Sequence, residues 1–449
     1  MFFCRERPWA YIYAFFFLLS FLIFPIVPSW GASGGTTLRV GVALSVAGGT
    51  LSSSKSYTLV DAQGKRHSFS GSVPVKYFKG NTVVVKGKTL SLPVKIQGSA
   101  PVAWGNHPYR GSLEMRQGAS GISIINIIDV ESYLRGVLKM EANPAWPQEF
   151  LKAQAVVART YAMSHKGKHG AEHFDICATP HCQVYRGINA EDSRIDRAIQ
   201  ETRGMVLFYQ GKYALTPYHS DSGGSTADVR DVWGGSVPYL LSRQEPVAYT
   251  SPYSSWELSL TPRQVGETLR KMNLSVGEVH SMEVAKRDSH GRAITLQISG
   301  SSGSRNVSAH QFRMALGSKN LKSTNFQIQS SGKANLSVSP KDSVSFNEQE
   351  ELSLMTQQGV FSTEELMDML LHPEKQRSYL EKKRALPGSS IPQTPTFSSG
   401  PSLFQLLGKG WGHGVGLSQW GAKALAERGW TWEKILTHYY PGTTVKKVH

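Results

Sequence analysis

Four glycines surround one histidine near the C-terminal end of the sequence, in an arrangement that could do chemistry. Gly410, Gly412, Gly414 and Gly416 occupy alternate positions on both sides of His413. Alternate glycines permit positive φ angles and let a ligand or another backbone approach closely. A histidine held there can carry a proton, bind a ligand or donate a hydrogen bond. The alternative is a tight turn between a strand and a helix, in which His413 satisfies backbone groups.

A second segment, His219-Ser-Asp-Ser-Gly-Gly-Ser225, places a serine between an aspartate and two glycines. Asp221-Ser222-Gly223-Gly224 resembles the nucleophile loop of chymotrypsin-like proteases. That chemistry also needs a histidine and an aspartate placed to activate the serine, and no Ala-Ala-His-Cys-like segment precedes this one. We therefore favour a glycine-lined pocket wall.

The third candidate is Glu141, which directly follows a predicted helix and precedes Asn143-Pro144. A carboxylate there faces the negative end of the helix dipole, and burial beside Trp146 would raise its pKa further. A carboxyl group that stays protonated near neutral pH can act as a general acid on a glycosidic oxygen. The alternative is an exposed glutamate with no chemical role.

A short segment from His173 to Cys182 combines cysteine with histidine. Two cysteines outside the cytoplasm, here Cys177 and Cys182, most simply form a disulfide. Cysteine beside histidine is also typical of zinc sites. The spacing is not that of a standard zinc finger, so both interpretations stay open.

The charge of the chain suits an anionic surrounding. The 449 residues carry a formal charge of +16, which nucleic acid, anionic lipid or an anionic wall polymer would each match. No run of five or more basic residues occurs. We therefore expect a preference for an anionic compartment, and no nucleic-acid partner.

The N-terminus indicates where that compartment is. Arg5 and Arg7 precede an apolar run over residues 9–27, and small residues follow. This order is typical of a secretory signal, although the run is also near the length of a membrane span. Residues 1–33 are therefore expected to be a cleaved signal peptide or an anchor in the cytoplasmic membrane. The rest of the chain would lie outside the cytoplasm, in the periplasm or at the cell wall.

The patterns along the chain predict an α+β fold, with a mixed β-rich core, several helices and an active-site groove between them. Short alternating runs predict a β-rich part over 38–120. Apolar periodicity predicts helices over 130–140, 147–164, 191–203 and 261–272. Residues 331–401, rich in Ser, Lys, Gln and Pro, are expected to be an insertion with a helix over 348–385. The core would then consist of 121–330 and 402–449, where Ser418 can cap a helix from Gln419.

Taken together, these sequence segments resemble those of the SpoIID/LytB family of bacterial cell-wall proteins. The resemblance covers roughly 120–330 and 402–446, more loosely 38–120, and leaves 331–401 unmatched. It rests on Val130-Glu-Ser-Tyr-Leu-Arg-Gly-Val-Leu-Lys-Met-Glu141, Trp146-Pro, Leu151-Lys-Ala-Gln-Ala-Val-Val-Ala-Arg-Thr-Tyr-Ala162, His181-Cys-Gln-Val-Tyr185, His219-Ser-Asp-Ser-Gly-Gly-Ser-Thr226, Val232-Trp-Gly-Gly, Gly410–Ala422 and His438-Tyr-Tyr-Pro-Gly442.

The resemblance implies action on the glycan strands of peptidoglycan. SpoIID-type members are lytic transglycosylases that cut between N-acetylmuramic acid and N-acetylglucosamine, preferably in strands without stem peptides. The family's catalytic glutamate corresponds to Glu141. Because the muramic acid's own 6-hydroxyl attacks and leaves a 1,6-anhydro end, one carboxyl group can serve as acid and then as base. No second acid belongs obviously with Glu141, although Asp221, Asp228 and Asp231 would be partners if the fold brings them close.

The same resemblance implies the remaining site residues. Some SpoIID-like enzymes bind zinc through Cys and His in the region matching 173–182. The candidate ligands are His173, Cys177 and Cys182, with a Cys177–Cys182 disulfide as the alternative. The Gly-His loop would form a wall of the glycan groove. Residues expected to contact substrate are His181, Gln183, Tyr185, His219, Ser220, Ser222, Gly223, Gly224, His413 and Gln419.

Two rival functions remain. LytB-like members include amidase enhancers, so the chain could bind the wall and stimulate an N-acetylmuramoyl-L-alanine amidase without cutting glycan itself. A purely structural wall-binding protein is the other alternative. A glutamate at position 141 favours the enzyme.

Overall fold

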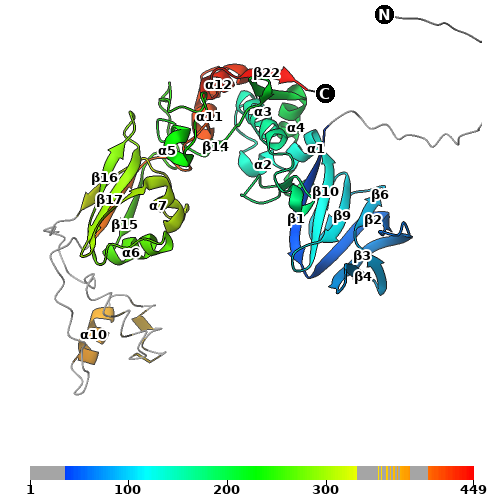
Figure 1. Cartoon of the computed structure of the whole chain (residues 1–449), viewed down its shortest axis with the longest axis horizontal. Helices are drawn as coiled ribbons and strands as arrows, with labels where there is room; N and C mark the ends of the chain where they lie inside the picture. The colour runs from blue at the N-terminus through cyan, green and yellow to red at the C-terminus, as the bar shows by residue number, and fades with distance from the viewer. Residues whose placement is uncertain are drawn as a thin grey trace, which may run out of the picture.

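The computed structural model describes residues 36–330 and 403–448, together with scattered residues between 352 and 384. It has the α+β fold that the sequence predicted. Three regions follow one another along the molecule: a β-rich N-terminal unit, a helical middle and a second β-rich unit (Figure 1). The predicted signal or anchor over 1–33 lies outside the described residues, as does most of the predicted helix over 348–385. In the part that is described, no helix is both long and apolar enough to cross a membrane.

The N-terminal unit is a sheet whose strands pair antiparallel, except that β11 pairs parallel with β1. Its main path has the strand order β11-β1-β10-β9-β6-β2-β3-β4-β5, and β7 and β8 extend it from β2. Alternation of buried and exposed residues along β3 explains why one face closes the core and the other faces water. The strands are β1 (Thr37–Val46), β2 (Gly48–Val60), β3 (Arg66–Phe78), β4 (Thr82–Val85), β5 (Lys88–Ser91), β6 (Val94–Gly98), β7 (Val102–Trp104), β8 (His107–Tyr109), β9 (Ser112–Gln117), β10 (Ile122–Asp129) and β11 (Ile176–Cys177).

The helical middle begins directly after β10. Asp129 caps α1 (Val130–Arg135) by accepting a hydrogen bond from the Ser132 backbone N–H. The predicted single helix over 130–140 is wrong, because the chain turns at Gly136 and resumes as α2 (Leu138–Glu141). A Cβ at Gly136 would lie 2.4 Å from the Tyr185 ring, so this turn needs glycine. Short helices η1 (Gly170–Glu172) and η2 (Gly187–Ala190) follow later in the chain.

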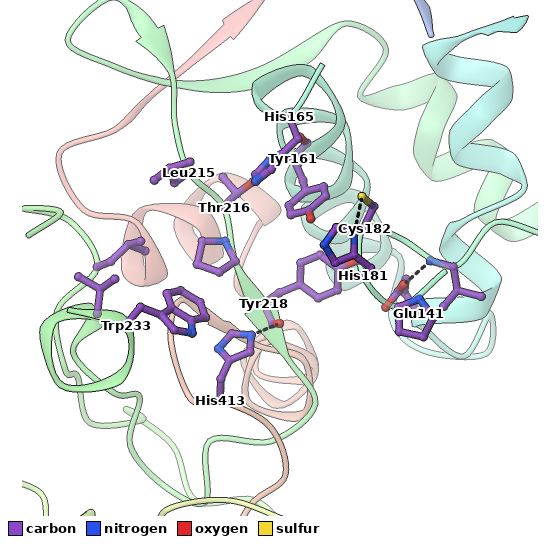
Figure 2. A pocket seen from close by; sticks show the side chains of 15 residues that line it. Glu141, Tyr161, His165, His181, Cys182, Leu215, Thr216, Tyr218, Trp233 and His413 are labelled. Atoms are coloured by element: carbon purple, nitrogen blue, oxygen red, sulfur yellow. Dashed lines mark hydrogen bonds between the residues drawn. The ribbon is translucent and has the colours of Figure 1, made fainter. Parts of the chain in front are cut away.

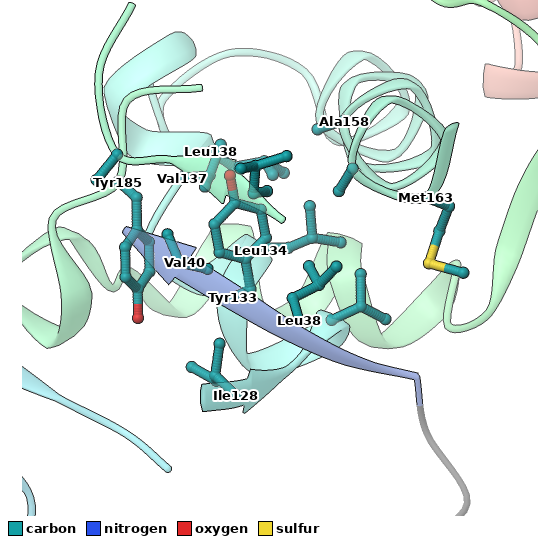
Figure 3. Packing of buried hydrophobic residues seen from close by; sticks show 14 of the residues in the cluster. Leu38, Val40, Ile128, Tyr133, Leu134, Val137, Leu138, Ala158, Met163 and Tyr185 are labelled. Carbon is teal, nitrogen blue, oxygen red and sulfur yellow. The ribbon is translucent and has the colours of Figure 1, made fainter. Parts of the chain in front are cut away.

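The centre of this middle region is α3 (Gln148–Ser164), whose small side chains are buried as expected. It packs against α4 (Ser193–Glu201), α11 (Gln419–Glu427) and α12 (Trp432–Tyr439). Figure 3 shows how the apolar face of α1, α2 and α3 closes over β1 and β10, with Leu38, Tyr133 and Leu138 inside. The predicted cap at Ser418 is present, because its side chain accepts a hydrogen bond from Gly421 N–H.

Two small sheets bring distant segments of the chain into this middle region. One contains β13 (Lys212–Tyr213), β12 (Met205–Tyr209) and β22 (Thr444–Lys447). In the other, β14 (Tyr218–His219) runs parallel to β21 (Leu417–Ser418). The helix α5 (Val229–Trp233) follows β14. The 219–225 segment and the Gly-His loop therefore lie side by side.

The second β-rich unit has its own buried apolar cluster. The sequence predicted a single core that includes all of 121–330. In the structure, residues 256–330 and 404–408 pack around this separate cluster, because their apolar side chains face one another. Its helices are α6 (Pro262–Lys271) and α7 (Ala309–Leu316), and its strands are β15 (Trp256–Leu260), β16 (Val279–Arg287), β17 (Ala293–Gly300), β18 (Gly303–Ser308), β19 (Phe326–Ser330) and β20 (Phe404–Gly408).

Candidate active site

Glu141 stands at the end of α2, where the chain leaves the helix in an extended conformation at Ala142. Its Oε1 accepts a hydrogen bond from Val184 N–H at 3.4 Å, and its carboxyl group is hydrogen-bonded to the Tyr218 side chain. Burial raises the pKa of Glu141, while these two hydrogen bonds act in the opposite direction. The carboxyl group is thus set up to hold a proton and still be stabilised after losing it.

The backbone of Glu141 is fixed from α11. Gln419 Nε2 donates to the Glu141 carbonyl at 3.0 Å and lies 3.4 Å from Gln154 Oε1. Gln419 is buried and does not line the cavity. It holds the acid in place, since a buried amide must be satisfied by neighbouring polar groups.

Glu141 opens into a cavity of about 630 Å³, within the range of small-molecule binding sites. Figure 2 shows Glu141 and His181 on one side of it and Trp233 and His413 on the other. Of the described residues that line it, Glu141 alone carries a carboxylate. The lining comprises Glu141, Tyr161, His165, Pro180, His181, Cys182, Val184, Leu215, Thr216, Pro217, Tyr218, Val229, Trp233, Leu240 and His413.

Trp233 gives the far side of the cavity an aromatic wall. The side chain is 51% exposed, and its ring centroid lies 4.9 Å from that of His413. Sequence reasoning did not assign a role to Trp233, Tyr161 or Tyr218. All three lie within or directly beside the blocks that carried the family resemblance, which was the available signal.

His413 cannot relay a proton in this arrangement. Its Nε2 lies 3.0 Å from the Tyr218 carbonyl, and its Nδ1 accepts from Val415 N–H at 3.1 Å. Burial lowers the pKa of His413 to about 3, so the ring is neutral at ordinary pH. The histidine lines the cavity but both ring nitrogens are used by backbone, which agrees with the turn interpretation and with a positioning role.

The glycines of this loop allow it to contact the backbone of another segment closely. Gly416 has φ 71°, and a Cβ there would lie 2.1 Å from the Pro217 carbonyl oxygen. At Gly410, φ is 76° and a Cβ would lie 2.7 Å from the Asp221 carbonyl oxygen. The alternate glycines therefore let the loop lie directly on the 217–223 segment.

The 219–225 segment does not form the expected cavity wall. Ser222 is fully buried, and its hydroxyl donates to Glu245 Oε1 at 2.7 Å. Arg292, reaching from the second β-rich unit, donates to the carbonyls of Ser222 and Ser225 at 2.6 and 2.7 Å. The segment is a largely buried joint between units, and among the described residues no histidine is hydrogen-bonded to Ser222, as a serine protease would require.

Gln183, Tyr185 and His219, which were also expected to contact substrate, are buried. Ser220, Gly223 and Gly224 do not line the cavity either, because the Gly-His loop and the Arg243–Glu245 backbone occupy that side. Buried polar groups in cores are kept in place by hydrogen bonds. Gln183 bonds with the Tyr133 hydroxyl, Tyr185 donates to Asn126, and His219 Nδ1 lies 3.2 Å from the Val415 carbonyl.

Glu245, which sequence reasoning missed, is a buried carboxyl group in this joint. Burial raises its pKa to about 7, although hydrogen bonds from Tyr439 and Ser222 lower it. Between the unfolded value of about 4.5 and 7, the folded state binds more protons than the unfolded one. Its contribution to the free energy of unfolding is therefore full below pH 4.5 and is lost as the pH rises towards 7.

We expect Glu245→Gln to remove this pH dependence. From pH 4.5 to 7.5, the free energy of unfolding of the wild type should fall by about 1–3 kcal/mol relative to that of the variant. Urea denaturation across that pH range measures both free energies. Glu283→Gln, at an exposed position, is the matched control. A difference that stays constant with pH would refute the assignment.

A group of four thiol and imidazole side chains lies beside the cavity. The ligand atoms of His169, Cys177, His181 and Cys182 all lie within 4.8 Å of one another. His181 Nδ1 is 3.7 Å from each sulfur, and His169 Nε2 is 3.5 Å from Cys182 Sγ. Tetrahedral zinc places N and S ligands roughly 3.3–3.8 Å apart. No disulfide joins Cys177 and Cys182 in the structure, and the types and spacing of the four residues fit the metal.

The cluster includes His169 and not His173, which the sequence suggested as a ligand. His173 ends η1 in a left-handed conformation, φ 68°, and its carbonyl accepts a hydrogen bond from Arg39. This turn directs the chain onward to β11, and His169 supplies the imidazole instead. His181 belongs to the cluster and also lines the cavity.

Comparison with known proteins shows what the chain is similar to. Residues 118–209 match the family model of stage II sporulation protein, SpoIID, and residues 236–343 match a domain of unknown function, DUF8618. Residues 118–209 are thus a SpoIID domain, and these findings with the relatives below support the SpoIID/LytB family for the chain.

Two relatives show how far this similarity extends. The amidase enhancer of Bacillus subtilis is 30% identical over 323 residues, which is 70% of this chain and 40% of that protein. The stage II sporulation protein D of Bacillus amyloliquefaciens is 25% identical over 336 residues, covering 71% of this chain and 75% of the relative. The chain thus spans two fifths of the amidase enhancer's length.

Proposed function

We propose that this protein is a peptidoglycan lytic transglycosylase. Family membership supports a cell-wall-related role. The observation that carries the proposal is the position of Glu141, whose carboxyl group has a raised pKa and is the carboxylate among the described residues lining the cavity. Glycosidases that hydrolyse usually need two carboxyl groups, whereas lytic cleavage needs one.

Glu141 would act twice in this reaction. It donates its proton to the glycosidic oxygen, so that the bond from muramic acid C1 to that oxygen breaks and N-acetylglucosamine leaves with a free 4-hydroxyl. The carboxylate, stabilised by Val184 N–H and Tyr218, then takes the proton of the muramic acid 6-hydroxyl. That oxygen bonds to C1 and closes the 1,6-anhydro ring. No water is consumed, and the acid is regenerated.

The deciding experiment compares the ends produced from denuded glycan strands. Incubation with purified protein followed by mass spectrometry should show 1,6-anhydro-muramic ends. Reducing muramic ends would mean hydrolysis and would refute the lytic mechanism. The preference for denuded strands is checked by using strands with stem peptides as the parallel substrate, which should be cut more slowly.

A non-catalytic enhancer of an amidase is the second candidate, because a relative 30% identical to this chain is an amidase enhancer. Under this alternative, glycan would stay intact while an N-acetylmuramoyl-L-alanine amidase released stem peptides faster in the presence of the protein. Both functions place the protein outside the cytoplasm, at the cell wall.

We also propose that His169, Cys177, His181 and Cys182 hold a structural zinc ion. Four protein ligands fill a tetrahedral site and leave no open position for substrate. The metal would link the segment around His169 to the one that carries His181 and Cys182. Since these two line the cavity, the protein ligands would fix the wall beside Glu141.

Purified protein is expected to contain one zinc ion per chain, measured by elemental analysis. Cys182→Ser should release the metal and lower the melting temperature by several degrees, because a structural zinc contributes directly to folding. A free-thiol assay with denaturant and chelator should find both Cys177 and Cys182 reduced. Protein without metal and without free thiols would show the disulfide instead.

A further inference from the structure

The net positive charge of the chain is concentrated in residues 36–117 of the N-terminal unit, where acidic residues are few. Residues 36–117 contain eleven Lys and Arg side chains but only two acidic ones, Asp61 and Glu114. These residues, which do not include Asp129 at the end of β10, therefore carry +9 of the formal charge of +16. The basic side chains are spread over several strands and turns, which is why they form no run in the sequence.

Neither acidic side chain is available at the surface. The Asp61 side chain is 7% exposed, and it accepts hydrogen bonds from the backbone of Gln63 and Lys65 in the β2–β3 turn. Glu114 is 3% exposed and is paired with Arg39 and Arg116. The surface of this unit is thus cationic without internal compensation.

Eight of the basic side chains remain exposed and are in none of the ion pairs found among the described residues. They are Lys55, Lys65, Arg66, Lys76, Lys79, Lys86, Lys88 and Lys95. Exposed like charges gathered on one small unit raise its energy unless an anionic partner is bound. The unit therefore carries an unmatched positive field.

The strand register places several of these groups along β3. Val60 on β2 has Arg66 of β3 opposite it on one side and Lys95 of β6 opposite it on the other. Arg66 and Lys95 therefore lie on the same face of the sheet, at one end of β3. Lys76 lies ten residues further along β3, at an exposed position of the same alternating face. Ten residues of strand span roughly 30 Å.

The middle of this face is lined with hydroxyl groups. Ser68, Ser70 and Ser72 are exposed on β3 between its two charged ends. Lys55 lies in the irregular part of β2 between Ser53 and Tyr57, opposite the middle of β3. Near the far end, Lys86 N–H donates to the Pro74 carbonyl. We call this surface the β3 stripe: Lys55, Arg66, Lys76, Lys86 and Lys95 with the serines between them.

The chemistry of the β3 stripe fits a linear ligand with anionic groups repeated along its length. Ammonium and hydroxyl groups donate hydrogen bonds to phosphate oxygens. A membrane surface is a poorer fit, since interfacial binding also buries apolar side chains. The large apolar side chains exposed in this unit are Leu44 and Phe78, and neither lies among these serines.

We propose that the β3 stripe is a docking surface for an anionic phosphodiester polymer of the cell wall. The choice of a wall polymer rests on the proposed cell-wall role, but the stripe is independent of the catalytic step at Glu141. Binding would be electrostatic and salt-dependent, and would hold the protein at the wall while the cavity engages glycan.

The test uses the full chain and purified sacculi that carry covalent polyol-phosphate polymer, beside the same sacculi stripped of phosphodiesters with hydrofluoric acid. The stripe variant is Lys55→Ser, Lys76→Ser, Lys86→Ser and Lys95→Ser. The control variant removes the same charge elsewhere, through Lys212→Ser, Lys271→Ser, Arg305→Ser and Lys319→Ser, all exposed positions. Circular dichroism and thermal melting establish that both variants are folded.

We expect wild type and control to bind polymer-bearing sacculi at least about tenfold more tightly than the stripe variant does, with the advantage shrinking from 50 to 200 mM salt. On stripped sacculi, the three proteins should bind with equal affinity. All three should also cleave denuded glycan at the same rate. Equal binding by the two variants, or binding to anionic vesicles but not to the polymer, would overturn the proposal. Failure of glycan cleavage alone would refute the transglycosylase and leave the docking result standing.

Discussion

Replacement of Glu141 by glutamine is expected to reduce glycan cleavage by about 10²–10⁴-fold, the contribution typical of a general acid. Glutamine keeps the size of the side chain and can still accept a hydrogen bond from Val184 N–H, but it cannot donate a proton to the leaving oxygen. Because the change is local, the melting temperature should stay within a few degrees of the wild type. The measurement is the rate of anhydro-muramic end formation from denuded strands.

Asp231→Asn is the matched control for this experiment. Asp231 was one of the acids that sequence suggested as a partner of Glu141, yet it does not line the cavity. We expect its rate to stay within about twofold of wild type, as for a surface substitution with no role in chemistry. If Glu141→Gln kept the wild-type rate, or if Asp231→Asn lost as much, the single-acid mechanism would be wrong.

The largest effect on stability is expected from Arg159→Met. Arg159 is fully buried in α3, and its guanidinium group makes two hydrogen bonds with Glu131, at 2.9 and 2.7 Å. It also donates to the Met205 carbonyl at 3.0 Å. Removing one partner of a buried ion pair leaves the other charge without compensation, at a cost of about 3–5 kcal/mol. Urea denaturation measures the loss.

Two further variants separate the ion pair from simple packing. Glu131→Gln combined with Arg159→Met should recover a large part of the loss, since no uncompensated charge then remains. Arg197→Met breaks an exposed pair with Glu201 and should cost less than about 1 kcal/mol. A double variant as unstable as Arg159→Met would show that the lost volume and backbone contacts dominate.

The parts of the fold that sequence predicted are those determined by local chemistry. The apolar face of α3, the helix predicted over 261–272 and the Ser418 cap each depend on residues within a few positions of one another. Glu141 was identified because its family block is continuous in sequence. Such features need no knowledge of long-range packing.

The parts that sequence could not give depend on distant segments. The cluster takes His169 and not His173 because a left-handed residue at His173 reverses the chain there, which spacing alone does not reveal. Ser222 is buried because Glu245 and Arg292 bond to it from other elements. Nothing near Ser222 in the sequence indicates either partner.

The pairing of β15 with β20 has a consequence for the order of folding. The contact between His219 and Val415 joins residues 196 positions apart, and closing so long a loop carries a large entropic cost. The second β-rich unit has its own buried cluster and places Trp256 opposite Gly408. If it folds first, the chain still to be closed shrinks to about 45 residues, which lowers the cost by roughly 1 kcal/mol. Folding of the second β-rich unit thus brings the Gly-His loop close to the 217–223 segment against which the loop packs.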